Sequence, residues 1–329
     1  MRQLSTRALT DLEWWCGLAT SRDVGRALWQ HPVCGELTTD ACGYGWGGLL
    51  GRLVPARGFF SRVDQAARIN VQEMRAMLYT LQSFPHLRGP GVIRFRLDSM
   101  VSVHVLNSMR SRSPALMDVV RDLHAELHRR HLRAEGYWLS TVANAHADRL
   151  SRDRDSSDWG LRRSVFLVLH SRWGPLTIDR FATVLNTHLP RFNCAVANPD
   201  AEAVDAYKQH WGGPEHNYTN PPLSQAESAM SKVAADGTSA VLVLPVWPAQ
   251  RWWWRITRLA QAAVILPDRA PLFTHGEYAG PGLSPRWQTA AFYVAPPTTP
   301  STVSAGENML IWESWPPSAR PAPAPRPRG

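Results

Sequence analysis

Hydrophobic and polar positions along the first 150 residues follow the periods of strands and amphipathic helices. Residues 91–98 alternate strictly between apolar and polar side chains, as in a strand with one buried face. Residues 70–84 and 114–132 repeat apolar residues at three- and four-residue spacing, which predicts two helices. Residues 36–41 and 46–53 read as short strands joined by a glycine turn, which predicts a hairpin.

A third strand after this hairpin, a fifth near RAEGYWL and a short helix over VANAHADRLSR complete the first pattern. We therefore expect an α/β domain built on a mixed five-stranded sheet with helices. A second, smaller α/β pattern follows the charged stretch SRDRDSSDWG and includes a predicted helix over DAEAVDAYKQHW, and proline dominates the C-terminal end. The predicted organisation is a lead-in over 1–33, a first domain over 34–152, a linker over 153–160, a second domain over 161–296 and a largely disordered tail over 297–329.

The charge of the chain favours a polyanionic partner. The formal net charge is +9, and nearly all the positive charge is arginine, whose planar fork suits phosphate oxygens. A genome rich in arginine codons explains the same excess. The four cysteines form no CxxC pair, and no apolar run is long enough to span a bilayer. These features, with no signal-peptide core at the start, predict an intracellular protein of the cytoplasm or nucleus that does not contact membranes.

Four carboxylates stand at the ends of neighbouring predicted elements: Asp40, Glu73, Asp98 and Asp148. Like charges brought together repel and raise each other's pKa, and divalent cations remove that repulsion. Oxygen ligands are those that magnesium prefers, so the sequence predicts a site for two Mg²⁺ or Mn²⁺ ions. Each carboxylate alone has a structural alternative. Asp148 could pair with nearby arginines, and Glu73 with Arg68 or Arg75.

Four stretches resemble, in order and spacing, the ribonuclease H domain of retrotransposon reverse transcriptases, especially DIRS-type and related tyrosine-recombinase elements: TDACGYGWGGLL, NVQEMRAMLYTLQSF, IRFRLDSMVSVHVLN and NAHADRLSR. The lead-in is similar to the segment after the polymerase thumb. The resemblance implies that Asp40, Glu73, Asp98 and Asp148 are the catalytic metal ligands. It also implies an RNA–DNA hybrid as substrate and the polymerase part of the same polyprotein as a partner. We expect Arg94 and Arg96 to bind nucleic acid.

Two departures from this resemblance leave an alternative open. Trp138 stands where many family members carry a histidine, and His146 is two residues from Asp148 and on another side of the helix. The chain also has no polymerase YxDD-like sequence. A catalytically inactive, nucleic-acid-binding retroelement relic is therefore the alternative function, and the sequence does not indicate an oligomeric state.

The second domain resembles phage-type DNA adenine methyltransferases at Asp179, Asn186 and the tripeptide Asn220, Pro221, Pro222. In that family an NPPY motif binds the target base, and its aromatic residue stacks on it. Here Leu223 replaces the aromatic residue, and no glycine-rich cofactor loop precedes Asp179. We therefore favour a degenerate copy that does not bind S-adenosylmethionine, with active methylation as the alternative.

A run of tryptophans and a group of histidines each have a possible binding role and a purely structural alternative. Trp252–Trp254, flanked by Arg251 and Arg255, could grip single-stranded nucleic acid, although a helix would more often bury two of the three indoles. His124, His128 and His131 have the spacing of zinc ligands on a helix, but a solvated helix face is the favoured interpretation.

Overall fold

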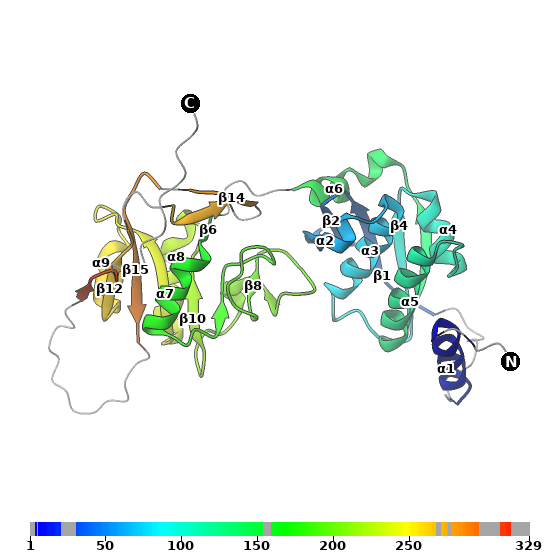
Figure 1. Ribbon diagram of the computed structural model, residues 1–329, viewed down its shortest axis with the longest axis horizontal. Coiled ribbons are helices and arrows are strands. Elements are labelled where there is room, and N and C mark those ends of the chain that lie inside the picture. Colours follow the sequence, from blue (N-terminus) through cyan, green and yellow to red (C-terminus); the bar gives the residue numbers. More distant parts are fainter. Residues whose placement is uncertain are drawn as a thin grey trace.

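The protein is described by a computed structural model that covers residues 4, 6–20, 31–153, 159–267, 271–275, 278–283, 285–295 and 310–316. Figure 1 shows two bodies, one built on each side of the 154–158 segment. None of the described helices is long and apolar enough to cross a membrane.

The first body contains the predicted mixed five-stranded sheet. Its order is β3-β2-β1-β4-β5. β1 pairs antiparallel with β2 and β2 antiparallel with β3, whereas β1, β4 and β5 run parallel. This topology confirms the ribonuclease H-like fold class. The strands are β1 (Val33–Ala41), β2 (Gly45–Leu50), β3 (Val54–Phe59), β4 (Gly91–Leu97) and β5 (Leu132–Trp138).

Helices pack on both faces of this sheet. The predicted helices are α3 (Ile69–Gln82), α5 (Pro114–Arg129) and α6 (Thr141–Arg152). Two additional helices, α2 (Arg62–Gln65) and α4 (Met100–Ser108), were not predicted. Ser99 caps α4 by accepting a hydrogen bond from the backbone N–H of Ser102, which turns the chain into a helix directly after β4. The lead-in forms α1 (Thr6–Thr20), tied to α5 by an ion pair between Asp11 and Arg121.

Two adjacent glycines let helices approach β2 from opposite faces. A Cβ at Gly47 would lie 2.5 Å from Ser151 N and 2.6 Å from Ala147 O in α6. A Cβ at Gly48 would collide instead with Thr80 in α3. Successive strand residues point to opposite faces, so α3 and α6 cover different faces of the sheet. Gly47 and Gly48 of GYGWGG therefore serve close packing.

The second body is built on a six-stranded sheet of order β16-β12-β15-β11-β10-β7. Its strands are β7 (Ile178–Asp179), β10 (His216–Thr219), β11 (Ser239–Pro245), β12 (Ala262–Ile265), β15 (Thr289–Val294) and β16 (Ile311–Glu313). Its helices are α7 (Arg163–Trp173), α8 (Ala226–Asp236) and α9 (Trp253–Leu259), with the short 3₁₀ turns η1 (Ala206–Lys208) and η2 (Leu223–Gln225). Two small sheets join β6 (Trp159–Leu161), β13 (Phe273–His275) and β14 (Tyr278–Leu283), and β8 (Asn193–Cys194) with β9 (Ala203–Val204).

Three expectations for the second body were wrong in detail. The predicted helix over DAEAVDAYKQHW is instead β9 and η1, because Asp205 has a φ of 60°, a left-handed conformation that interrupts a helix. Trp159 and Gly160, assigned to the linker, belong to β6, and residues 154–158 lie outside the described residues. The predicted tail contributes β16, which pairs with β12; most of the remaining tail lies outside the described residues.

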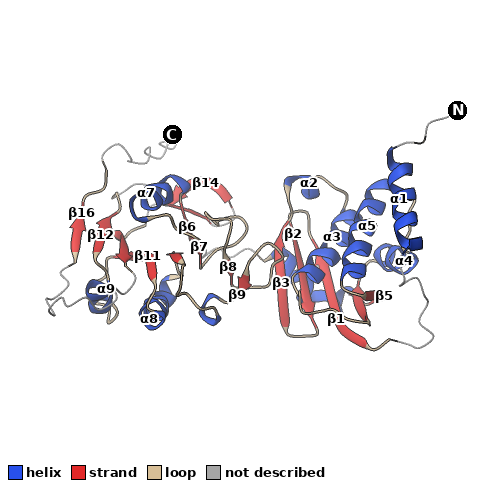
Figure 2. Cartoon of the chain, turned by 90° about the horizontal axis from the view of Figure 1, so that it is seen from below, coloured by secondary structure: helices blue, strands red, loops and turns tan. Residues whose placement is uncertain are grey.

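The two bodies touch at the outer side of β3. The backbone N–H of Arg57 donates to the carbonyl of Ala197 at 3.1 Å, and Asn198 Nδ2 donates to the carbonyl of Arg57 at 3.0 Å. The segment around β8 and β9 lies beside β3 in Figure 2, and an isolated bridge joins Ala56 to Ala197. Ala197 is buried as part of the first body's hydrophobic core.

Candidate active site

Asp40 lies next to the last residue of β1 and is held by two side chains of α6. Ser151 Oγ donates to one carboxylate oxygen at 2.7 Å, and Asn144 Nδ2 donates to the other at 3.2 Å. Both donors are buried, since Asn144 and Ser151 are at most 2% exposed. The carboxylate is thereby oriented without a cationic partner in direct contact.

Asp98 and Asp148 share the space around Asp40. Asp98 follows β4, the strand that runs parallel to β1, and Asp148 comes from α6. Burial, together with the negative charges of Asp98 and Asp148, raises the pKa of Asp40 from 3.8 to about 6, although the Ser151 hydrogen bond and the Arg152 charge oppose the change. Three of the four predicted carboxylates thus interact electrostatically.

Glu73 and Asp148 also have protein partners. Ser102 Oγ, in α4, donates to Glu73 Oε2 at 2.7 Å. Arg152 Nε donates to Asp148 Oδ1 at 2.7 Å, one helical turn away. The structural alternative for Asp148 therefore describes a real ion pair, whereas Arg75 pairs with Asp64 and Asp122.

The hydroxyl and amide groups that hold these carboxylates were not predicted from the sequence. Asn144, Asp148 and Ser151 are spaced by four and three residues, which places them on one helical face. That spacing was a usable signal for Asn144 and Ser151. Ser102 gave no comparable signal, because its role depends on the unpredicted helix α4.

The donor set fits divalent cations by its chemistry. All four side chains are carboxylates, and the pKa of Asp40 is raised by burial first and by the negative charges of Asp98 and Asp148 in addition. Across the described ranges, no group of three or more histidine, cysteine, aspartate or glutamate side chains lies close enough to hold a metal ion. Neither the four carboxylates nor the three histidines His124, His128 and His131 form such a group among the described residues. Glu73 and Asp148 are turned to Ser102 and Arg152, respectively.

The predicted nucleic-acid-binding arginines are engaged by acidic neighbours. Arg94 lies 3.5 Å from Glu135 and 5.4 Å from the ring of Tyr137, and Arg96 lies 2.6 Å from Glu36. In the second body Arg251 is exposed, and Arg255 lies 3.6 Å from Glu227. Their role in binding stays a prediction.

The three consecutive tryptophans are arranged as expected for a helix that buries two of its three indoles. Trp252 is buried, Trp253 is half-buried and Trp254 is 68% exposed. Two of the three indoles therefore serve the hydrophobic core, which leaves Trp254 as the one with an open face.

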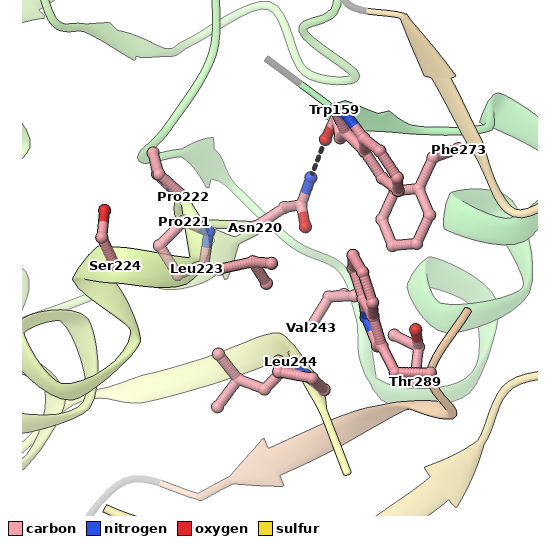
Figure 3. A pocket seen from close by; sticks show the side chains of 12 residues that line it. Trp159, Asn220, Pro221, Pro222, Leu223, Ser224, Val243, Leu244, Phe273 and Thr289 are labelled. Carbon is pink, nitrogen blue, oxygen red and sulfur yellow. Dashed lines mark hydrogen bonds between the residues drawn. The ribbon is translucent and has the colours of Figure 1, made fainter. Parts of the chain in front are cut away.

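The methyltransferase-like residues are divided between a cavity and the buried interior. Asn220, Pro221 and Pro222 line a cavity of about 390 Å³ at the end of β10 (Figure 3). Asp179 is 2% exposed and accepts hydrogen bonds from the backbone N–H groups of Phe181 and His188. Asn186 accepts hydrogen bonds from the backbone and hydroxyl of Thr183.

Aromatic side chains form part of this cavity although Leu223 is not aromatic. Trp159 and Trp287 are stacked with their ring centroids 5.5 Å apart, and Phe273 lies beside Trp159. Asn220 Nδ2 donates to the Trp159 carbonyl at 2.7 Å, and its oxygen points into the cavity (Figure 3). The cavity therefore has flat apolar walls and a polar group at one side.

Comparison with known proteins concerns the fold only. No protein-family model matches the chain, and no curated protein matches it in sequence. Among solved structures, LC11-RNase H1 in complex with an RNA/DNA hybrid is 19% identical, with a TM-score of 0.31 over 35% of this chain and 92% of that one. The N-terminal RNase H domain of rv2228c from Mycobacterium tuberculosis is also 19% identical, with a TM-score of 0.30 over 36% and 92%. A foamy viral protease–reverse transcriptase in complex with an RNA/DNA hybrid is 13% identical, with a TM-score of 0.29 over 46% and 26%.

Proposed function

We propose that the first body is a two-metal ribonuclease H that cleaves the RNA strand of RNA–DNA hybrids, within the reverse transcriptase polyprotein of a DIRS-type or related retroelement. The observation that supports this proposal is the raised pKa of Asp40, near the carboxyl end of β1, to which burial and the negative charges of Asp98, directly after the parallel strand β4, and of Asp148, in α6, contribute. Glu73, from α3, supplies the fourth carboxylate.

Asp40, Glu73, Asp98 and Asp148 would hold Mg²⁺ or Mn²⁺. Such ions, when bound, supply an activated water and charge stabilisation for the leaving oxygen of a phosphodiester. The chain's own residues orient the ligands. Ser151 and Asn144 fix the carboxylate of Asp40, and Ser102 fixes that of Glu73. Arg152 offsets negative charge at Asp148, which lowers the cost of bringing an anionic substrate to this edge of the sheet.

The decisive experiment is hydrolysis of an end-labelled RNA–DNA hybrid by the full chain in Mg²⁺. We expect the unchanged protein to cleave only the RNA strand, and Asp98→Asn to lose cleavage while keeping its fold. Asp118→Asn is the matched control, because Asp118 is an exposed carboxylate on α5 whose ion pair with Arg121 is worth little. Binding of the hybrid without cleavage by the unchanged protein would replace this proposal with the inactive relic.

DNA adenine methyltransferase activity is kept as a second candidate because of the cavity beside Asn220. The aromatic walls of the cavity supply flat surfaces that Leu223 does not. The amide oxygen of Asn220 could accept a hydrogen bond from the amino group of a base. However, the carboxylate of Asp179 is buried and already accepts backbone hydrogen bonds. We therefore expect no heat of binding when S-adenosylmethionine is titrated into the full chain at millimolar concentration. Saturable binding that Asn220→Ala removes would revive this function.

A further inference from the structure

Trp138 places an exposed indole beside a candidate metal ligand. It is the last residue of β5 and is paired in register with Leu97, which precedes Asp98. Its Nε1–H donates to the backbone carbonyl of Asp98 at 3.1 Å. The side chain is nevertheless 56% exposed.

The hydrogen bond fixes the ring before any ligand arrives. A free tryptophan loses side-chain entropy when it is immobilised on binding, whereas this indole is already held at one edge. Satisfying one backbone carbonyl does not require a large apolar surface in water. The hydrogen bond therefore accounts for the Nε1–H of Trp138 but not for the exposed apolar face of its ring.

More apolar surface is exposed next to Asp98. Met100 and Val101, in the first turn of α4, are 62% and 47% exposed. The connection from Trp138 to α6 contains only Leu139 and the capping residue Ser140, so the indole stays close to the helix that carries Asp148. Asp98 is therefore followed closely in the chain by exposed apolar side chains and is hydrogen-bonded, through its backbone, to an exposed indole.

We propose that Trp138 is a substrate-positioning residue whose open indole face packs against a nucleotide of the hybrid next to the cleaved phosphate. This inference rests on the proposed function. Metal ions at the carboxylates would attract the cleaved phosphate, but they would not contact the apolar faces of the bases and sugars beside it. Bases and sugars present apolar faces, and aromatic side chains bind them with little regard to sequence. Trp138 can therefore hold the strand in position while leaving the carboxylates to the reaction.

The sharpest test compares Trp138→Phe with Trp138→Leu, because both lose the hydrogen bond to Asp98 and only the phenylalanine keeps a ring. Equilibrium binding of a fluorescent RNA–DNA hybrid is measured in the Asp98→Asn background, which separates binding from cleavage. We expect the dissociation constant to rise about tenfold with leucine and less than threefold with phenylalanine. Trp15→Ala, at a 60% exposed tryptophan of α1, is the control and should change binding less than twofold.

Cleavage of the hybrid by the same Trp138 variants, now with Asp98 unchanged, gives an independent readout. Because the contact forms with substrate and persists through the reaction, leucine should raise KM about tenfold and leave kcat within about twofold. Equal losses for phenylalanine and leucine, at equal thermal stability, would overturn the proposal and make Trp138 a structural support of Asp98. Unchanged binding by both variants would likewise reject it, even if the hybrid is cleaved. Ring-dependent binding without cleavage by the unchanged protein would uphold the contact and reject the nuclease.

Discussion

Replacing Asp40 by asparagine is expected to remove hybrid cleavage and to make the fold more stable at neutral pH. Loss of a group that stabilises charge in a transition state typically slows a reaction by about 10²–10³-fold or more, so no cleavage should be detectable in a standard assay. Stability should change in the opposite direction because the Asp40 carboxylate is buried in its ionised form and, to a lesser degree, lies near the charges of Asp98 and Asp148. Asparagine removes the buried charge and its repulsion and can still accept the hydrogen bond from Ser151 or Asn144.

The stability gain should depend on pH with a defined sign. The pKa of Asp40 is raised from 3.8 in an unfolded chain to about 6 in the fold. The neutral form therefore favours folding fully below about pH 3.8, and this contribution is lost as the pH rises through about 6. At pH 7 the ionised group costs roughly 1–2 kcal/mol, after allowance for the solvent that still reaches it.

Urea unfolding of Asp40→Asn and the unchanged protein, in EDTA at several pH values, measures this effect. The variant should be the more stable at pH 7, and its advantage should disappear towards pH 4. Added Mg²⁺ should stabilise the unchanged protein and not the variant, because an ion that binds only the folded state shifts unfolding by mass action. An advantage that is the same at all pH values would show that repulsion between the carboxylates is not its cause.

Replacing Gly47 by alanine is expected to damage both stability and the candidate site. The new Cβ would lie within 2.6 Å of backbone atoms of Ala147 and Ser151, so α6 has to move away from β2. Overpacking of this kind costs about 1–3 kcal/mol, and more where backbone has to shift. The same helix carries Asn144, Asp148 and Ser151, so cleavage should fall along with stability.

Gly43→Ala is the matched control, since nothing lies within 4 Å of a Cβ built at Gly43. Thermal unfolding followed by circular dichroism should show a midpoint several degrees lower for the Gly47 variant and one near that of the unchanged protein for the control. Equal midpoints for the two variants would mean that α6 does not approach β2 as closely as the structure has it.

Local pattern was sufficient for most of the first body. The alternation in β4 and the apolar stripes of α3 and α5 each report one buried face, and the buried residues Ile93, Met77 and Leu123 lie on those faces. The helix α4 was missed because it begins two residues after a strand, where Ser99 reverses the chain by capping. A helix over residues 200–211 was predicted from composition, and the left-handed Asp205 prevents it.

In the candidate site, too, some residues could be predicted from the sequence and others could not. The four carboxylates at the ends of neighbouring predicted elements are visible in the sequence, and their joint role as metal ligands stays a prediction. Their supporting groups depend on tertiary contacts: Ser102 reaches Glu73 only through the position of α4, and Trp138 reaches the Asp98 carbonyl only through the register between β4 and β5. Register of this kind is not encoded in any one segment.

The contact at the outer side of β3 limits how the first sheet can grow. Unpaired edge strands recruit strands from other molecules. In β3, Pro55 has no N–H to donate, and both the N–H and the carbonyl of Arg57 are occupied by Ala197 and Asn198. Asn198 can approach β3 this closely because residue 58 is a glycine. A Cβ at that position would lie 2.6 Å from Asn198 Nδ2. Within the described part of the chain, a foreign strand therefore finds no run of free backbone groups along β3. At the opposite edge the side chain of Asn107 likewise occupies both the N–H and the carbonyl of Gly136 in β5, so intermolecular sheet extension is hindered at both edges.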